Sequence, residues 1–249
     1  MATLRVDGMT SFTKGRYSVQ QANNAAERAD IHALRSLCFG VADPFDVDGY
    51  DDRCTHVMIK DTASGTIVCC YRLLALQGGD VSQSYAAQFY DLTALRSYDG
   101  LMMELGRFCV HPDWHDPDIV RLAWAALTDF VDSYDVQMLF GCSSFEGTDK
   151  SRHLDAFAML KARHLGPDSW RPHAKSPDAY RFAAESQGTA DAKRAMAQMP
   201  PLLRTYLLMG GWVSDHAVYD HELNTMHVFT GLEIGMIPEN RKRLLRALV

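Results

Sequence analysis

The segment MELGRFCVHPD, residues 103–113, decides the expected fold of this chain. It extends an apolar run, which predicts a buried strand over Leu101–Val110. Yet it places Glu104 and Arg107 three residues apart, and such residues point to opposite faces of a regular strand. Both side chains can face one cleft only if the strand bulges between them, and Gly106 suits a bulge.

Two interpretations of this charged pair remain open from spacing alone. Glu104 and Arg107 are either a buried ion pair, which stabilises a fold weakly because desolvation offsets the attraction, or part of a reaction site. A bulge exposes backbone N–H groups, so a site here has a carboxylate, a guanidinium and amide donors together. These groups are typical of acyl transfer, which needs a base, a charge clamp and an oxyanion hole.

The composition is that of a globular protein and excludes several function classes. The chain has 249 residues, 47% hydrophobic and 22% charged, which is enough for a sizeable core. A formal net charge of −6 disfavours general nucleic-acid binding. No apolar run reaches the ~18 residues of a membrane-spanning helix, and the N-terminus lacks the apolar core of a secretory signal, so we expect a cytoplasmic protein.

Hydrophobic periodicity predicts an α/β protein with a mixed sheet and helices on its faces. Helices are expected over 20–39, 116–133 with Asp116 as N-cap, 151–163 and 200–209. Strands are expected over 55–59, 66–75, 101–110, 137–144, 212–219 and 225–234. In a single domain spanning 1–249, residues 1–16 are expected to form a loose arm, 41–53 an acidic loop and 166–196 a surface excursion.

The six cysteines do not form a metal-binding pattern. The sequence contains no CxxC and no Cys/His spacing typical of a zinc site. Several of the cysteines lie in apolar runs, where a free cysteine packs as a small hydrophobic residue. We therefore expect reduced core thiols, no metal and no permanently bound cofactor.

The segment MELGRFCVHPD resembles the ELGR-x-CVHPD signature of the ornithine–acyl carrier protein N-acyltransferases, a family of the GNAT superfamily. The similarity extends over nearly the whole chain and includes LRSLCF (34–39), YDDRCTH (50–56), YRLL (71–74), FYDLTAL (89–95), LFGCSSFEGTD (139–149) and PPLLRTYLLMGGWVSDHAVYDHELNT (200–225). The resemblance implies a GNAT-like acyltransferase fold, with a mixed, mostly antiparallel central sheet and helices on both faces. Within the later motifs, Ser143, His216 and Asn224 are expected to contact substrate.

The front half also resembles the acyl-homoserine-lactone synthases, which share the fold and the acyl carrier protein donor. Their Arg-xxx-Phe, acidic, RLL and ExxR motifs match RSLCF (35–39), DGYDD (48–52), RLL (72–74) and ELGR (104–107). The resemblance thus implies a polar site made of Arg35, Phe39, Asp48, Asp51, Arg72, Glu104 and Arg107. The motifs PPLLRTYL and DHELNT of the C-terminal half argue against such a synthase, which lacks them.

The segment after the strand favours an acyl donor that is carried on a protein. GNAT acetyltransferases have a glycine-containing turn here, whose backbone N–H groups cradle the pyrophosphate of coenzyme A. This chain instead reads VHPDWHDPD (110–118), without glycine and with three aspartates whose negative charge disfavours a pyrophosphate. We predict the acyl-phosphopantetheine of acyl carrier protein as donor, and the candidates for docking that acidic partner are Lys150, Arg152, Lys161 and Arg163.

The resemblance implies transfer of a (3-hydroxy)fatty acyl group to the α-amino group of an amino acid. L-ornithine is the expected acceptor and a lyso-ornithine lipid the product, with glutamine or glycine as acceptor and homoserine-lactone synthesis as alternatives. We expect Glu104 to accept the ammonium proton, and Arg107 and Arg72 to bind the acceptor carboxylate. Asp48 and Asp51 are expected either to hold a cationic acceptor side chain or to anchor the acidic loop by pairing with Arg35.

The C-terminal segment ENRKRLLRALV, 239–249, interleaves cations and leucines. As a short basic helix it has the composition of an interfacial anchor, and each cation near anionic lipid contributes on the order of 1 kcal/mol. This interpretation places the protein in weak contact with the inner face of the cell membrane. The other interpretation, which we favour, is a helix that closes the domain with its leucines in the core.

Overall fold

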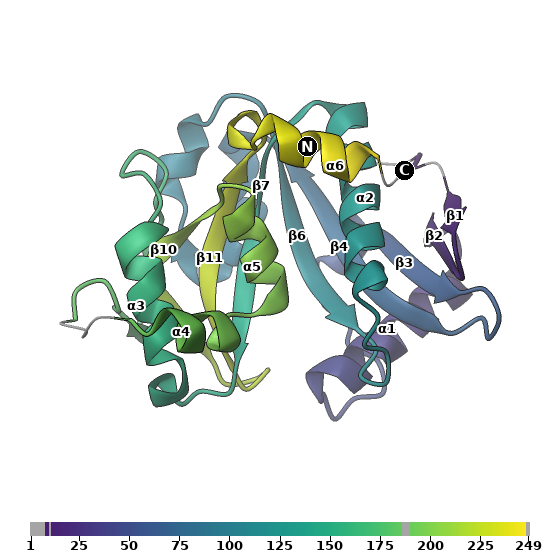
Figure 1. Cartoon of the computed structure of the whole chain (residues 1–249), viewed down its shortest axis with the longest axis horizontal. Coiled ribbons are helices and arrows are strands. Elements are labelled where there is room, and N and C mark those ends of the chain that lie inside the picture. The colour runs from purple at the N-terminus through teal and green to yellow at the C-terminus, as the bar shows by residue number, and fades with distance from the viewer. Residues whose placement is uncertain (1–7, 10, 186–189, 248–249) are drawn as a thin grey trace. The chain divides into compact units, whose positions relative to one another are not determined.

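The computed structural model describes residues 8–9, 11–185 and 190–247. Its tertiary contacts divide the chain into two compact units (Figure 1). The first unit comprises 1–76, 103–136 and 239–249, and the second comprises 77–102 and 137–238. The expectation of a single domain over 1–249 stays a prediction.

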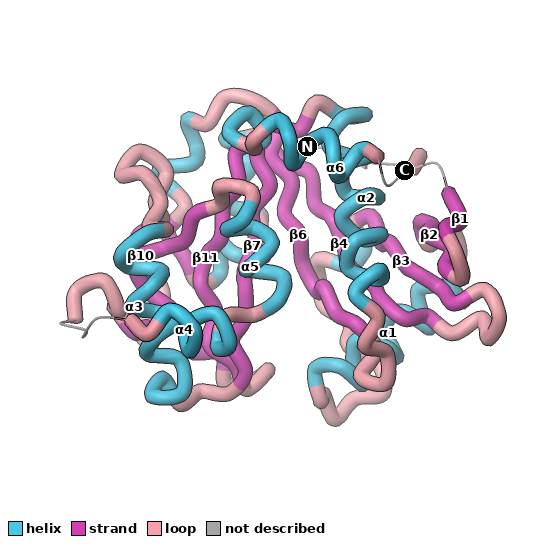
Figure 2. The backbone as a smooth tube through the Cα atoms, in the orientation of Figure 1, coloured by secondary structure: helices cyan, strands magenta, loops and turns pink. Residues whose placement is uncertain are grey.

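The sheet of the first unit consists, in this order, of β1 (Phe12–Lys14), β2 (Tyr17–Gln21), β3 (Thr55–Asp61), β4 (Ile67–Leu76) and most of β6 (Leu101–Val110). The pairs β1–β2, β2–β3 and β3–β4 are antiparallel, and Figure 2 shows β3, β4 and β6 as neighbours. The prediction of a loose arm over 1–16 is wrong where β1 lies, and residues 1–7 and 10 lie outside the described residues. Tyr17 and Val19 on β2 are buried and fix this hairpin to the core.

Helix α1 (Ala25–Phe39) begins later than the sequence predicts. Asn24 caps it, since its side chain accepts a hydrogen bond from the backbone N–H of Glu27. The preceding residues 17–21, predicted as helix from residue 20, form β2 instead. Residues 20 and 21 belong to this strand, because the spacing of apolar residues that predicts the helix does not mark its first residue.

Helices α1 and α2 (Pro117–Tyr134) cover opposite faces of this sheet. Tyr71 on β4 donates a hydrogen bond to the carbonyl oxygen of Ala123 in α2. The next strand residue, Arg72, shares the Asp51 carboxylate with Arg35 of α1. Successive strand residues point to opposite faces, so α1 and α2 lie on different sides.

Helix α6 (Glu239–Arg246) packs against α2 (Figure 1). Arg246 donates two hydrogen bonds of 2.8 Å to the Asp132 carboxylate. Leu244 is 61% exposed, so the favoured prediction of core leucines is wrong at this position, and Leu248 lies outside the described residues. Within the described residues no helix, α6 included, has the length and apolarity to cross a membrane.

The sheet of the second unit consists of β7 (Val136–Glu146), β11 (Thr225–Glu233), β10 (Trp212–Asp220) and β9 (Ala179–Tyr180), in this order and with antiparallel pairing. Strands β5 (Tyr90–Asp91) and β8 (His173–Ala174) pair separately. Helices α3 (Leu154–Arg163), α4 (Ala192–Gln198) and α5 (Pro201–Leu208) contribute to one core with β10 and β11. Phe157, Leu203 and Val228 are among its fully buried residues.

The described residues of 166–196, predicted as a surface excursion, are mostly exposed or partly exposed, but Tyr180 and Phe182 belong to this core. Tyr180 and Phe182 are 3% and 0% exposed, and both pack against Phe157 of α3. β9 also adds a strand beside β10. Prolines and polar residues dominate the segment, so its composition predicts exposure. The contacts with the core come from a few aromatic residues, which the composition does not reveal.

The prediction of reduced core thiols is confirmed for four cysteines. Cys54, Cys69, Cys70 and Cys109 are buried and free of disulfides. The Sγ atoms of Cys70 and Cys109 lie 3.4 Å apart in a thiol hydrogen bond. These residues therefore fill the core of the first unit.

Candidate active site

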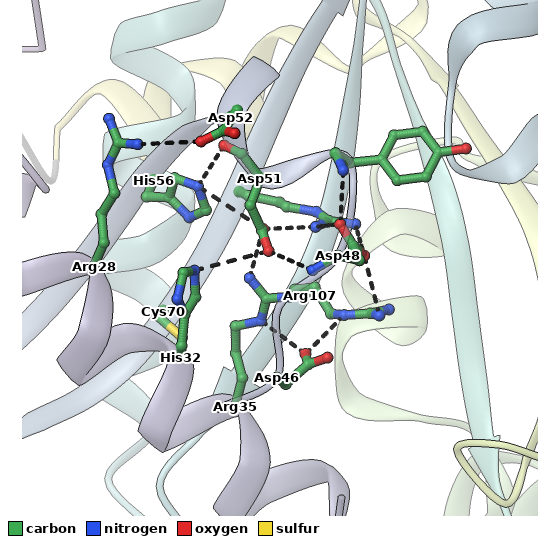
Figure 3. Close-up of polar contacts among 12 residues, drawn as sticks. Arg28, His32, Arg35, Asp46, Asp48, Asp51, Asp52, His56, Cys70 and Arg107 are labelled. Atoms are coloured by element: carbon green, nitrogen blue, oxygen red, sulfur yellow. Dashed lines mark hydrogen bonds and ion pairs between the residues drawn. The ribbon is translucent and has the colours of Figure 1, made fainter. Parts of the chain in front are cut away.

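Three arginines and three aspartates of the first unit form one network of ion pairs (Figure 3). The arginines come from three elements: Arg35 from α1, Arg72 from β4 and Arg107 from β6. The aspartates, Asp46, Asp48 and Asp51, come from the loop 41–53 that follows α1. The loop therefore connects α1, β4 and β6 through charge.

Asp51 and Asp46 hold the innermost arginine. Arg35 is 1% exposed and donates from Nε to Asp46 Oδ2 at 2.8 Å and from Nη1 to Asp51 Oδ1 at 2.7 Å. Arg72 Nη1 donates to the same Asp51 oxygen at 2.7 Å. In this geometry Asp51 anchors the loop, one of the two roles expected for it.

Asp48 is bound by two arginines. Arg72 contacts both of its oxygens, with Nη1–Oδ1 at 2.5 Å and Nη2–Oδ2 at 2.8 Å. Arg107 Nη2 lies 3.2 Å from Asp48 Oδ2, and its Nε lies 2.9 Å from Asp46 Oδ2. Its guanidinium carbon also lies 5.8 Å from the ring centre of Phe39, the last residue of α1.

Asp46 is a site residue that the sequence reasoning missed. It bridges Arg35 and Arg107 through one oxygen atom and is 8% exposed. The motif match reached only to residue 48. The alternation of Asp46 and Asp48 in FDVDGYDD is the signal that could have found it.

Burial and the arginines act in opposite directions on these carboxyl groups. Burial alone raises the pKa of Asp51, but hydrogen bonding and charge from Arg35 bring it well below its ordinary value. Burial and Arg72 act in the same way on the pKa of Asp48, which is also lowered. The pKa of Arg72 is raised, because Asp48 outweighs the lowering by burial. These groups are therefore charged at neutral pH.

Arg107 contacts the acidic loop, and Glu104 acts on the loop through its charge. The Glu104 residue is 4% exposed. The pKa of Tyr50 is raised first by the burial of Tyr50 and second by the charge of Glu104. Tyr50 in turn lies 5.6 Å from the guanidinium carbon of Arg72. Arg107 has a φ of 51°, so β6 departs from extended geometry next to Gly106, where the sequence predicts a bulge.

The ion-pair network joins three arginines to three aspartates, and the buried carboxyl group of Glu104 belongs to the same unit. Burial lowers the pKa of the neighbouring His32 and His56, which keeps both neutral at pH 7. Asp48, the most exposed of the three aspartates, is the carboxylate of the network most accessible to a cationic ligand such as an ammonium group.

His32, Asp51 and His56 have the spacing to hold a metal ion, with ligand atoms within 4.8 Å of one another. The Asp51 carboxylate, however, already accepts hydrogen bonds from two guanidinium groups. A dication bound there would meet two positive charges at short range. The donor set therefore fits structural pairing better than metal binding.

Three predicted substrate contacts lie in the second unit and have structural partners there. Ser143 Oγ accepts a hydrogen bond from Thr230 at 2.9 Å. His216 is fully buried, with Nδ1 2.7 Å from Asp215 Oδ1. Asn224 lies in the β10–β11 turn with a φ of 49°. Substrate contact by Ser143, His216 and Asn224 stays a prediction.

The N-terminus of α2 is occupied by its own cap, as the sequence predicts. Asp116 Oδ1 accepts a hydrogen bond from the backbone N–H of Asp118 at 2.9 Å, and its Oδ2 accepts one from Tyr17 at 2.8 Å. A phosphate group at a helix N-terminus needs free N–H groups and positive potential. Carboxylates hold this helix end instead.

The predicted docking cations differ in their surroundings. Lys150 pairs with Glu185 at 3.3 Å, and Lys161 donates to the carbonyl oxygen of Glu185 at 2.8 Å. Arg152 and Arg163 are exposed, and neither forms an ion pair with any residue that the structure describes. These two arginines are therefore the ones available to an acidic partner.

Comparison with known proteins finds relatives that are described as acyltransferases or acetyltransferases. An acetyltransferase (GNAT) domain family matches residues 38–125. The chain is 30% identical to an L-ornithine N(alpha)-acyltransferase of Rhodobacter capsulatus, over 91% of this chain and 93% of that protein. A Brucella abortus protein of the same name is 29% identical, over 90% of this chain and 87% of that protein.

Solved structures of low sequence identity share the fold. FeeM, an N-acyl amino acid synthase from uncultured soil microbes, has a TM-score of 0.50 and 10% identity, over 96% of this chain and 99% of that chain. The acyl-homoserine lactone synthase BjaI has a TM-score of 0.50 and 14% identity, over 92% of this chain and 87% of that chain. The predicted GNAT-like acyltransferase fold, a mixed and mostly antiparallel sheet with helices, is confirmed.

Proposed function

Because this chain belongs to the L-ornithine N(alpha)-acyltransferase family, we propose that it transfers a (3-hydroxy)fatty acyl group from acyl carrier protein to the α-amino group of L-ornithine. The product of this reaction is a lyso-ornithine lipid. The observation that carries the proposal is the charged network of the first unit, with the buried carboxyl group of Glu104 on the same strand as Arg107.

Glu104 is the proposed general base. The α-amino group of an amino acid is mostly an ammonium at neutral pH, and it must lose a proton before it attacks the thioester carbonyl carbon. Glu104 accepts this proton directly or through a water. The C–N bond then forms and the C–S bond breaks. The phosphopantetheine thiolate leaves and takes up the second proton from the amine nitrogen, and Glu104 releases the first proton to water.

Arg107 and Asp48 are the proposed contacts for the two ends of ornithine. Arg107 has the most exposed side chain of the three arginines, at 12% compared with 1% for Arg35 and 3% for Arg72. Asp48, at 21%, is likewise the most exposed of the three aspartates. The acceptor carboxylate binds Arg107 and the side-chain ammonium binds Asp48, so each substrate charge displaces part of one existing ion pair.

The aspartates of the network support ornithine over the alternative acceptors glutamine and glycine. Ornithine carries one positive charge more than either of them, and Asp48 can pair with that charge. A neutral side chain forms no such ion pair. Backbone amides of residues 106–108 are the proposed donors to the oxyanion, since β6 is irregular there.

The cap of α2 supports a carrier-borne donor. The Asp116 carboxylate accepts a hydrogen bond from the N–H of Asp118 and puts a negative charge where a coenzyme A pyrophosphate would bind. Phosphopantetheine on a carrier protein has one phosphodiester and no adenosine. Arg152 and Arg163 are the proposed contacts for the acidic carrier protein. Efficient use of the matching coenzyme A thioester contradicts this part of the proposal.

The proposed function is tested by incubating the protein with 3-hydroxyacyl carrier protein and L-ornithine, glutamine or glycine, and by mass spectrometry of the products. We expect acylated ornithine, formed far faster from the carrier thioester than from the coenzyme A thioester. If glutamine or glycine is acylated faster than ornithine, that amino acid is the acceptor. If the protein forms a homoserine lactone from S-adenosylmethionine, the proposed function is wrong.

The mechanism is tested with Glu104→Gln and Arg107→Lys. We expect Glu104→Gln to fold normally and to lose about 10²- to 10⁴-fold in kcat, the usual contribution of a general base. Arg107→Lys keeps the charge but lacks the planar fork, so its KM for ornithine rises. If Glu104→Gln keeps a kcat near that of the unmodified protein, Glu104 is not the base, and Asp48, Asp51 or a water takes that role.

A further inference from the structure

Helix α6 presents one face to α2 and the other to solvent. Lys242 and Leu245 are partly buried, and Arg246 is held on Asp132 of α2 by two hydrogen bonds of 2.8 Å. Residues 240, 241, 243, 244 and 247 are exposed. The contacts with α2 therefore fix which side of the helix faces outward.

The outward face carries one leucine between two arginines. A helix turns by about 100° per residue, so Arg241 lies about 60° from Leu244 on one side and Arg243 about 100° on the other. Leu244 is 61% exposed, while Arg241 and Arg243 are exposed as well. Aliphatic residues flanked by cations are typical of helices that lie in a membrane interface.

The ion pairs of α6 reduce its free positive charge. Arg246 is paired with Asp132 and Lys242 with Glu239, the latter at 2.9 Å. Arg241 and Arg243 form no ion pair with any residue in the described part of the chain. Two of the four cations counted in the sequence therefore remain available, on a chain whose formal net charge is −6.

We propose that the outer face of α6 docks weakly and reversibly on an anionic lipid surface. Leu244 enters the boundary between headgroups and acyl chains, and Arg241 and Arg243 contact anionic headgroups. The partner is anionic because the free charges of the face are both positive. The docking does not depend on the proposed reaction, although a fatty acyl product partitions into the same surface.

The position of α6 favours lipid over an acidic carrier protein, the other anionic partner to consider. A carrier must bring its thioester to the arginine–aspartate network, which lies on the α1 side of the first unit's sheet. Helix α6 rests on α2, which covers the opposite face of that sheet. Carrier binding by α6 is therefore kept as an outcome of the test.

The test is co-sedimentation of the full chain with vesicles of phosphatidylcholine alone or mixed with phosphatidylglycerol. We expect binding to the mixed vesicles only, weakening as salt is added. Arg241→Glu and Arg243→Glu should each lower the partition constant by about fivefold or more, since one cation near anionic lipid accounts for roughly that factor. Leu244→Ser should lower it without any change of charge.

Lys193→Glu on α4 is the matched control, since it reverses one exposed charge elsewhere. It should leave vesicle binding unchanged, and all variants should keep the melting temperature because these side chains face solvent. Equal binding by all variants, or an equal loss in Lys193→Glu, overturns the proposal. It is also overturned if the α6 variants bind vesicles normally but raise the KM for the carrier protein.

Discussion

Asp46 joins two arginines that come from different elements of the first unit. Arg35 and Arg107 each donate through Nε to the same oxygen, at 2.8 and 2.9 Å. Asp46→Asn removes the negative charge between two largely buried guanidinium groups. Because breaking a buried pair leaves charge uncompensated, we expect the free energy of unfolding to fall by about 3 kcal/mol, measured by urea denaturation.

Asp52→Asn is the control from the same loop. The Asp52 side chain is 98% exposed and lies 3.9 Å from Arg28, so its loss should change the free energy of unfolding by about 0.5 kcal/mol or less. If both variants lost the same free energy of unfolding, stability would depend on the net charge of the loop and not on the ion pairs of Asp46.

At the residue scale, the sequence predicts most members of the network but not which arginine pairs with which aspartate. The motifs indicate Arg35, Arg72 and Arg107 as site residues, and the structure places all three against loop aspartates. The partner of each arginine could not be predicted, because in a loop without regular geometry the sequence does not determine which side each aspartate faces. Asp46 lies outside the matched motif, and only its alternation with Asp48 in the sequence points to it.

At the element scale, the sequence predicts strongly apolar segments better than polar ones. Strand β6 and helix α2 are predicted within a few residues, since their apolar residues repeat with strand or helix period. The hairpin β1–β2 and the short strand β9 were missed, because each buries only one or two side chains. Such elements depend on neighbours distant in sequence, which local periodicity does not report.

The β10–β11 hairpin offers a test of the role of Asn224. Its φ of 49° is in the left-handed region, where asparagine and glycine are tolerated and branched residues are strained. We expect Asn224→Gly to keep the melting temperature and Asn224→Val to lower the free energy of unfolding by about 1–2 kcal/mol.

Kinetics of the same variant separates turn from substrate contact. If Asn224 serves the turn alone, Asn224→Gly keeps the KM for ornithine. A raised KM at unchanged stability assigns the side chain to the substrate. Loss of stability in Asn224→Gly contradicts the conformational argument itself.

At the scale of the whole molecule, buried titratable groups make stability depend on pH in two windows. The lowered pKa values of Asp48 and Asp51 contribute stability above the ordinary aspartate pKa of 3.8, and this stability is lost as pH falls below it. Buried histidines act at higher pH. Burial lowers the pKa of His227 to about 4 from an ordinary value of 6.5.

The sign for His227 follows from proton binding in the two states. Between pH 6.5 and 4 the unfolded chain binds a proton at this residue that the folded chain excludes. The stability is therefore complete above pH 6.5 and falls as pH is lowered toward 4, by at most about 1.4 kcal/mol per pH unit. His32 and His56, whose pKa values are also lowered by burial, act in the same direction.

The contribution of His227 is measured by urea denaturation of the unmodified protein and of His227→Asn from pH 7 to pH 4.5. The side chain of His227 lies 3.0 Å from the Tyr90 hydroxyl through Nδ1, a contact that the asparagine amide can replace. We expect the variant to lose less stability over this range, so that the difference between the two proteins narrows or reverses as pH falls. His115→Asn, at an exposed position, should leave the pH dependence unchanged. Parallel curves for the unmodified protein and His227→Asn would mean that His227 takes up its proton without unfolding the second unit, and that the acid sensitivity comes from other groups.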